Sequence, residues 1–228
     1  MSGMDTSVDT CTRRDVPETV ANCPDAPSDA SAAPVALTLP LEKAALAGLR
    51  AGDAVTLTGP LYTLRDAGHM RLLDELHAAG ELPYGLSGQA IFYAGPTPSA
   101  AGRPFGAVGP TTASRMDFAA PELYDAGIAA TVGKGVRSQA VKDACARNGA
   151  VYFITVGGAA AYLAKCVVSS EVLAYDDLGT EALRRIEVRD FPAFVGVDVL
   201  GQDAYELARE GATASDAADD SAAEAGVR

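Results

Sequence analysis

Four polar side chains stand where the chain is expected to turn, and their types suit the binding of a small dicarboxylate. They are Arg65, Thr111, Arg115 and Lys134, and a second threonine, Thr112, follows Thr111. Arginine presents a planar fork of N–H groups that pairs with both oxygens of a carboxylate. The threonines follow a Gly-Pro pair, so either hydroxyl can cap a helix whose N-terminus attracts an anion. Unrelated surface residues and a simple capped helix remain the alternatives.

The elements that would position these side chains alternate between strands and helices, with glycine turns between them. We expect strands over residues 35–39, 53–58 (stopped by Gly59-Pro60), 90–94, 128–132, 150–156, 167–175, 183–188 and 194–199. We expect helices over 42–50, from about residue 66 to Gly80, and over 119–127, 137–148 and 159–165. This alternation predicts an α/β domain with some parallel pairing. Ligands of such sheets gather at the carboxyl ends of strands, where the four polar residues are expected.

The two ends of the chain differ in composition from the middle. The net charge is −12, and residues 1–34 and 206–228 each carry six acids and two bases. Both ends have few large apolar residues, so we expect disordered acidic tails around a domain over 35–205. The middle has no cluster of Lys and Arg, which argues against a nucleic-acid partner. No apolar run reaches membrane-spanning length and the N-terminus lacks a signal-peptide core, so we expect no membrane partner and a cytoplasmic protein.

Four cysteines are present, and their spacing does not predict a metal site. Cys11, Cys23, Cys145 and Cys166 form no CxxC pair, and neither histidine lies close to any of them in the sequence. We therefore expect no zinc site, no disulfide framework and no iron–sulfur cluster held by this chain alone.

Six motifs occur in order along the chain. They are residues 61–71 (LYTLRDAGHMR), 93–97 (YAGPT), 109–117 (GPTTASRMD), 133–135 (GKG), 156–160 (VGGAA) and 191–192 (FP). This pattern resembles the β-type (C-terminal) domain of class I iron–sulfur fumarases and L(+)-tartrate dehydratases, over about residues 36–205. The resemblance implies a swivelling β/β/α fold, similar to the mobile domain of aconitases. It also implies a [4Fe–4S] cluster held by three cysteines of a separate α-type domain or subunit, whose fourth iron binds the substrate.

The resemblance assigns roles to individual residues. Positions matching Arg65, Arg115 and Lys134 bind the substrate carboxylates, and the position matching Thr111 takes the proton from substrate C3. A threonine hydroxyl is a poor base at neutral pH and needs a nearby cation, a helix N-terminus or an ionised partner to activate it. Thr112 is the competing candidate both for taking this proton and for capping a helix. Thr111 and Arg115 are thus the catalytic candidates, and Thr112 is a further substrate-binding candidate.

Three neighbouring residues have supporting roles in this interpretation. His69 follows Arg65 by four residues, so on a helix it either orients Arg65 or only closes the pocket wall. Asp66 pairs with Arg65 or Arg71, or else lies on a solvated face. Asp117 is expected to be structural. The departures from the family pattern are Gly68 and Met70, where alanine and lysine are common.

Three functions are compatible with these residues. The first is the β subunit of a hetero-oligomeric hydro-lyase that adds water to fumarate, active only with an α-type partner subunit. The second keeps the chemistry but takes L-tartrate, which differs by one hydroxyl that no residue of the sequence identifies. The third is a non-catalytic swivelling domain that binds a carboxylate or a partner protein.

Overall fold

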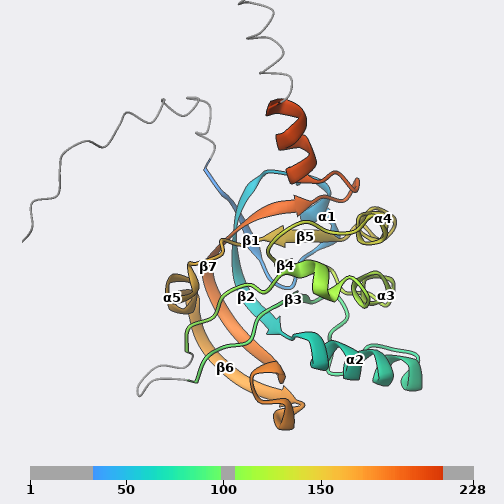
Figure 1. Cartoon of the computed structure of the whole chain (residues 1–228), viewed down its shortest axis with the longest axis vertical. Helices are drawn as coiled ribbons and strands as arrows, with labels where there is room; N and C mark the ends of the chain where they lie inside the picture. The colour runs from blue at the N-terminus through green and yellow to red at the C-terminus, as the bar shows by residue number, and fades with distance from the viewer. Residues whose placement is uncertain (1–32, 99–105, 213–228) are drawn as a thin grey trace, which may run out of the picture. The chain divides into compact units, whose positions relative to one another are not determined.

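The computed structural model describes residues 33–98 and 106–212 and shows a mixed α/β domain (Figure 1). Its strands are β1 (Val35–Thr38), β2 (Ala54–Thr63), β3 (Ala90–Phe92), β4 (Ala130–Gly133), β5 (Val151–Ile154), β6 (Val167–Ala174) and β7 (Leu183–Val197). Its α-helices are α1 (Lys43–Ala47), α2 (Asp66–Ala79), α3 (Ala120–Asp125), α4 (Gln139–Asn148) and α5 (Ala160–Leu163). Three 3₁₀ turns complete the set: η1 (Ala113–Met116), η2 (Ala164–Cys166) and η3 (Asp176–Glu181).

Five of the strands close into a ring. The strand order is β1-β2-β3-β4-β5-β7-β6, and β2 also pairs with β7, which joins the two halves of the sheet. The strands β2, β3, β4 and β5 run parallel to one another, whereas β7 is antiparallel to both β2 and β5. The strands β1 and β6 extend the sheet outside this ring. The predicted parallel pairing is therefore confirmed, and the antiparallel strand β7 closes the ring.

Alternate residues of the ring strands pack into two separate apolar clusters. Phe92, Phe153 and Phe191 belong to one cluster, which also contains residues of α1 and α5. Ile91 and Tyr152 belong to the other, which contains the buried faces of α2, α3 and α4. These three helices lie along one side of the sheet in Figure 1. The central strands β3, β4 and β5 are buried on both faces, which explains their near-continuous apolar sequences.

The helices follow their sequence signals closely. Leu72 and Leu76 form the buried face of α2, as their spacing predicts. Gly80 ends α2 and Gly149 ends α4, each in the left-handed conformation that favours glycine after a helix. Residues 204–212 are also helical, so the tail expected from residue 206 begins as a helix. The rest of that tail, and the N-terminal tail up to residue 32, lie outside the described residues.

Two expectations about strand ends were wrong. Gly59-Pro60 does not stop a strand, because β2 continues through it to Thr63. The β2–β7 register shifts between Leu57 and Gly59, which is a bulge. On the other edge of β2, the β1 pairing ends at Thr58 and the β3 pairing begins at Tyr62, so Pro60 falls where no strand pairs with that edge. Likewise, the two strands expected over 183–188 and 194–199 are one strand, β7.

The bulge makes a stability prediction. Gly59 has φ +124°, and a Cβ built there lies 2.6 Å from the Leu39 carbonyl oxygen. Gly59→Ala combines backbone strain with a clash against main chain, so we expect the free energy of unfolding in urea to fall by about 3 kcal/mol or more. Gly52→Ala is the matched control, since Gly52 has φ +99° but no atom within 4 Å of the added Cβ. It should cost only the strain, about 1–2 kcal/mol. Equal losses for the two variants would contradict the clash.

Candidate functional site

The carboxyl ends of three adjacent parallel strands carry the predicted site residues. Arg65 lies two residues after β2 and is the residue that precedes α2, while Lys134 follows β4 directly. Between them, Tyr93 follows β3. Figure 1 shows α2 leaving the end of β2, next to the end of β3. We call the group formed by Arg65, Asp66, Thr111, Thr112, Arg115 and Lys134 the carboxyl-end cluster.

Backbone hydrogen bonds fix the threonine segment across two of these strand ends. The Thr111 N–H donates to the Tyr93 carbonyl oxygen at 2.7 Å, beyond β3. Beyond β4, the Lys134 N–H donates to the Thr111 carbonyl oxygen at 3.3 Å, and the Ala113 N–H donates to the Lys134 carbonyl oxygen at 2.8 Å. Thr112 and Lys134 form an isolated parallel bridge. The structure therefore brings Thr111, Thr112 and Lys134 together through the main chain.

The segment after Thr112 is a single 3₁₀ turn and not an α-helix. Thr112 precedes η1, but its hydroxyl makes no capping hydrogen bond to the described residues. The Thr111 side chain is half-buried and that of Thr112 is exposed. The helix capping that the sequence allowed for these hydroxyls is thus not seen at η1. Both threonines lie beside the strand ends, and neither hydroxyl caps this turn.

Two arginines of the cluster meet at one carboxylate. Arg115 Nη2 lies 2.9 Å from Asp66 Oδ1, and Arg65 Nε lies 3.9 Å from Asp66 Oδ2. Glu181 Oε1 approaches Arg65 Nη2 at 3.8 Å. Arg71, the other partner expected for Asp66, pairs with Asp177 instead. Asp66 therefore lies between Arg65 and Arg115 and neutralises part of their positive charge.

Further contacts tie the Arg65 side chain to the end of β3. A Cβ built on Gly95 lies 3.0 Å from Arg65 Cδ and 3.1 Å from Nη1, so only glycine lets the guanidinium approach there. Among the described residues, the buried Arg65 Nε has no hydrogen-bond partner. Lys134 is exposed, and its Cδ passes 3.6 Å from a Cβ built on Gly157, after β5. The side chains of Arg65 and Lys134 thus reach residues that follow the neighbouring strands β3 and β5.

His69 lies completely buried beneath the cluster. Its Nδ1 is 2.9 Å from the Arg65 carbonyl oxygen, which only accepts, so Nδ1 carries the proton. Its ring packs edge-on against Tyr93, with the centroids 5.2 Å apart. Burial lowers the pKa of His69 to about 4, because the charged form loses its hydration. Arg137 lowers this pKa further, while the Arg65 carbonyl and Asp66 raise it.

This pKa predicts a pH-dependent stability. Histidine has a pKa near 6.5 in the unfolded chain. Between pH 6.5 and about 4, His69 is therefore protonated in the unfolded chain but neutral in the folded chain. The free energy of unfolding should therefore fall as the pH drops through that window, by about 3 kcal/mol in total from this residue. His69→Gln should remove this part of the slope in urea unfolding measured from pH 7 to 4.5. His77→Gln, which changes the exposed histidine paired with Glu122, should keep it. Parallel curves for wild type and His69→Gln would contradict the buried neutral histidine.

One buried cation at this edge was missed by the sequence analysis. Arg137 follows Lys134 by three residues, and its side chain is fully buried. Its Nε donates to Asp117 Oδ1 at 2.7 Å and its Nη1 to Thr131 Oγ1 at 3.1 Å. The second oxygen of Asp117 accepts the Ser138 N–H at 2.7 Å, at the start of α4. Asp117 thus has the structural environment that the sequence predicted. The polar sequence around Arg137 gave no indication that its side chain is buried.

The described cysteines do not form a metal site. Cys145 is buried in α4, where burial raises the pKa of its thiol to about 11. Cys166 is partly buried in η2, and its Sγ lies 3.9 Å from the carbonyl oxygens of Tyr162 and Asp190. Cys11 and Cys23 fall outside the described residues. Within residues 33–98 and 106–212, no group of three or more His, Cys, Asp or Glu side chains could hold a metal ion.

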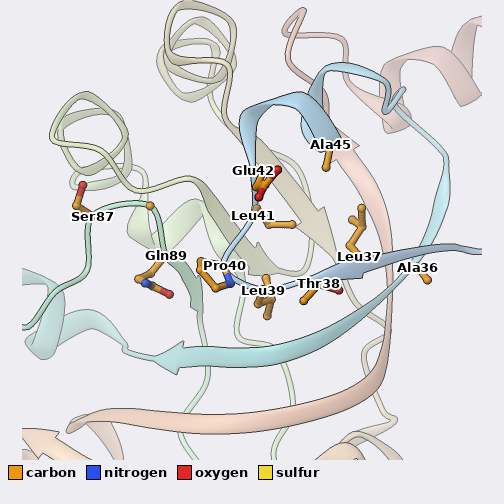
Figure 2. A pocket seen from close by; sticks show the side chains of 11 residues that line it. Ala36, Leu37, Thr38, Leu39, Pro40, Leu41, Glu42, Ala45, Ser87 and Gln89 are labelled. Carbon is orange, nitrogen blue, oxygen red and sulfur yellow. The ribbon is translucent and has the colours of Figure 1, made fainter.

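A groove of about 710 Å³ lies away from the cluster, beside β1 (Figure 2). Residues 36–42 form one of its walls, and Ser87 and Gln89 stand on the other side. Its lining contains no lysine or arginine, so it lacks the charge that a dicarboxylate requires. The carboxyl-end cluster remains the candidate site.

In the part of the chain that the structure describes, no helix is long and apolar enough to cross a membrane.

Comparison with known proteins agrees with the motifs. The chain is 43% identical over 154 residues to the anaerobic class I fumarate hydratase of Escherichia coli K12, an alignment that covers 67% of this chain and 28% of that protein. It is 41% identical over 157 residues to fumarate hydratase 2 of Leishmania major, covering 68% and 28%. It is 35% identical over 170 residues to the L(+)-tartrate dehydratase subunit beta of E. coli K12, covering 72% and 83%. The chain thus spans less than a third of the fumarate hydratases and most of the tartrate dehydratase subunit. Residues 9–208 match the family described as fumarase C-terminus, and the chain therefore belongs to the fumarase C-terminal family of the hydro-lyases.

Proposed function

We propose that this chain is the β subunit of an iron–sulfur hydro-lyase that reversibly adds water to fumarate to give (S)-malate. The observation that carries the proposal is the carboxyl-end cluster: Arg65, Thr111 and Lys134 lie beside the ends of β2, β3 and β4, and Arg115 shares Asp66 with Arg65. All four residues lie within the stretch that matches the fumarase C-terminus family. The swivelling movement that the resemblance implies is part of the same proposal.

Arg65 and Arg115 are the main carboxylate-binding groups in this proposal. Their guanidinium groups approach the two oxygens of Asp66, which holds them near each other before any substrate arrives. Arg115 is half exposed, so its remaining N–H groups are accessible to a substrate carboxylate. Lys134 adds a third positive charge from the end of β4. A dianion such as fumarate or malate would offset this concentration of positive charge.

Thr111 is the proposed acid–base group for the C3 proton. Its main chain is fixed on both sides, to Tyr93 and to Lys134, which fixes the direction from which its hydroxyl meets the substrate. The cations Arg115 and Lys134 belong to the same cluster and would stabilise the negative charge of an ionised hydroxyl. Thr112 lies on the same bridge and is the competing candidate.

The [4Fe–4S] cluster is proposed to come from an α-type partner subunit. When bound, it supplies a Lewis-acidic iron for the substrate hydroxyl and one carboxylate. The two described cysteines do not converge, because Cys145 is buried in the apolar cluster under α4 and Cys166 packs against the other apolar cluster. This chain contributes cations and hydroxyls, which suit the organic acid and not the metal.

L-tartrate is the second candidate substrate. The relative named L(+)-tartrate dehydratase subunit beta is matched over 83% of its length, whereas the matched fumarate hydratases are several times longer than the aligned part. The higher identity to the fumarate hydratases, 43% against 35%, favours fumarate.

Co-expression with an α-type subunit tests the proposal directly. We expect the purified chain alone to be inactive, and the anaerobically assembled complex to interconvert fumarate and malate. Parallel assays with L-tartrate decide between the two substrates. A stable complex without either activity, or full activity of this chain alone, would contradict the proposed division of labour. Dicarboxylate binding without complex formation would favour a non-catalytic binding domain.

A further inference from the structure

Two segments carry most of the carboxyl-end cluster, and a buried ion pair joins them in addition to the backbone hydrogen bonds of Thr111 and Ala113 with Lys134. The first segment runs from Thr111 through Arg115 and ends at Asp117, the residue that follows η1. The second runs from Lys134 to Arg137, before α4. The hydrogen bond from Arg137 Nε to Asp117 Oδ1, 2.7 Å long, connects their far ends.

The surroundings of Arg137 leave its side chain no freedom. Its guanidinium carbon lies 5.3 Å from the ring centroid of Tyr93 and 4.7 Å from that of Tyr152, so it is held by the two aromatic faces. Its Nη1 donates to Thr131 Oγ1, which in turn shares a hydrogen bond with the buried Tyr124 hydroxyl at 2.6 Å. These contacts come from β4, β5, α3 and the residue that follows β3.

The same network reaches the main chain just after β3 and just after β4. Tyr93 accepts the Thr111 N–H through its carbonyl oxygen, and Tyr152 donates its hydroxyl to the Gly135 carbonyl oxygen at 3.0 Å, next to Lys134. Asp117 also accepts the Ser138 N–H, which fixes the start of α4 to the end of η1. A change at Arg137 would therefore reach the main chain of both segments at once.

We propose that Arg137 is a positioning residue, and that its ion pair with Asp117 sets the spacing of the Thr111–Arg115 segment against Lys134. The catalytic part of this inference rests on the proposed function. Its structural part concerns the isolated chain and stands without it. Arg137 does not reach the substrate, because its side chain is completely buried. It acts through the residues whose main chain it fixes.

Backbone hydrogen exchange measured by mass spectrometry tests the structural part. Arg137→Met should raise the exchange rates of peptides that span 109–117 and 134–138 by about tenfold or more, because their common anchor is lost. Peptides from β2 and β7 should exchange as in wild type. Arg137→Met combined with Asp117→Asn leaves no unpaired charge and should fold even where the single variant does not. Unchanged exchange in both segments would overturn the proposal.

Kinetics of the complex test the catalytic part. We expect kcat to fall about 100-fold in Arg137→Met, because a displacement of about 1 Å at a reacting group costs that much. Arg137→Lys keeps the charge and should recover part of kcat. If Arg137→Met lost only thermal stability and kept its kcat, the positioning role would be contradicted. Arg147→Met is the matched control: Arg147, in the last turn of α4, also pairs with an aspartate, Asp125, through two hydrogen bonds of 2.7 and 2.6 Å at the surface. It should change neither exchange at the cluster nor kcat.

The two parts fail separately. If the wild-type complex does not turn over fumarate or tartrate, the proposed function is wrong, and hydrogen exchange in the free chain still decides whether Arg137 fixes the two segments. If the wild-type complex is active and Arg137→Met retains its kcat, the proposed function stands and the positioning role is wrong.

Discussion

Thr111→Val should lower kcat of the assembled enzyme by about 10²- to 10⁴-fold, the range that a general acid–base group contributes. Valine replaces the hydroxyl by a methyl group of similar size, so the packing around the half-buried Thr111 side chain should be kept. The main-chain hydrogen bonds to Tyr93 and Lys134 do not involve the side chain and should persist. KM should change little, since a proton-transfer group acts in the transition state more than in binding. Steady-state rates with fumarate and malate provide the measurement.

Thr112→Val is the matched control for this experiment. Thr112 has the same side chain and lies on the same bridge to Lys134, but it is exposed. We expect it to retain kcat within about threefold, as is usual for surface changes of well under 1 kcal/mol. If Thr112→Val is the inactive variant and Thr111→Val is not, the roles of the two threonines are reversed. Normal kcat in both variants would remove threonine from the proton-transfer step.

Arg115→Ala should lower kcat/KM by about 10²- to 10³-fold, with most of the loss remaining at saturating substrate. The variant removes a fixed cation whose charge-assisted hydrogen bonds hold a carboxylate through the reaction. Arg115→Lys keeps the charge but loses the planar fork, so it should recover only part of the activity. The pair that Arg115 forms with Asp66 is half exposed, so the unfolding free energy should fall by less than about 1 kcal/mol.

Arg71→Ala is the control that separates charge from position. Arg71 pairs with Asp177 at 2.7 Å, is exposed to a similar degree, and belongs to α2, whose first residue is Asp66. It should leave kcat/KM within about twofold of wild type, because exposed ion pairs contribute little. Equal losses for Arg71→Ala and Arg115→Ala would show a general effect of net charge, and would argue against a carboxylate-binding role for Arg115.

Local signals in the sequence sufficed for the elements whose boundaries depend on local chemistry. The leucine spacing of α2 and its terminal Gly80 predicted that helix, and Asn148-Gly149 predicted the end of α4. The order of strands and glycine turns also placed Arg65 and Lys134 at strand ends. Their placement follows from chain order, since adjacent parallel strands end at one edge of a sheet.

Features that depend on distant partners were not predictable in this way. Gly59-Pro60 is a strand breaker by composition, yet the register of β7 and the gap between β1 and β3 accommodate it. Pro192 lies inside β7 in the same manner, opposite Thr56. Arg137 sits in a polar turn, and its burial depends on an aspartate 20 residues away and on two aromatic rings from other strands.

The bridge between Thr112 and Lys134 has a calorimetric consequence. Because folding alone orders this backbone, little conformational entropy is left to be lost when an acid arrives. The enthalpy of binding then reflects mainly the desolvation of charged groups. The heat-capacity change of binding stays small, because little apolar surface is buried. In the proposed function, the carboxyl-end cluster is a receptor prepared in advance, and its selectivity comes from charge geometry.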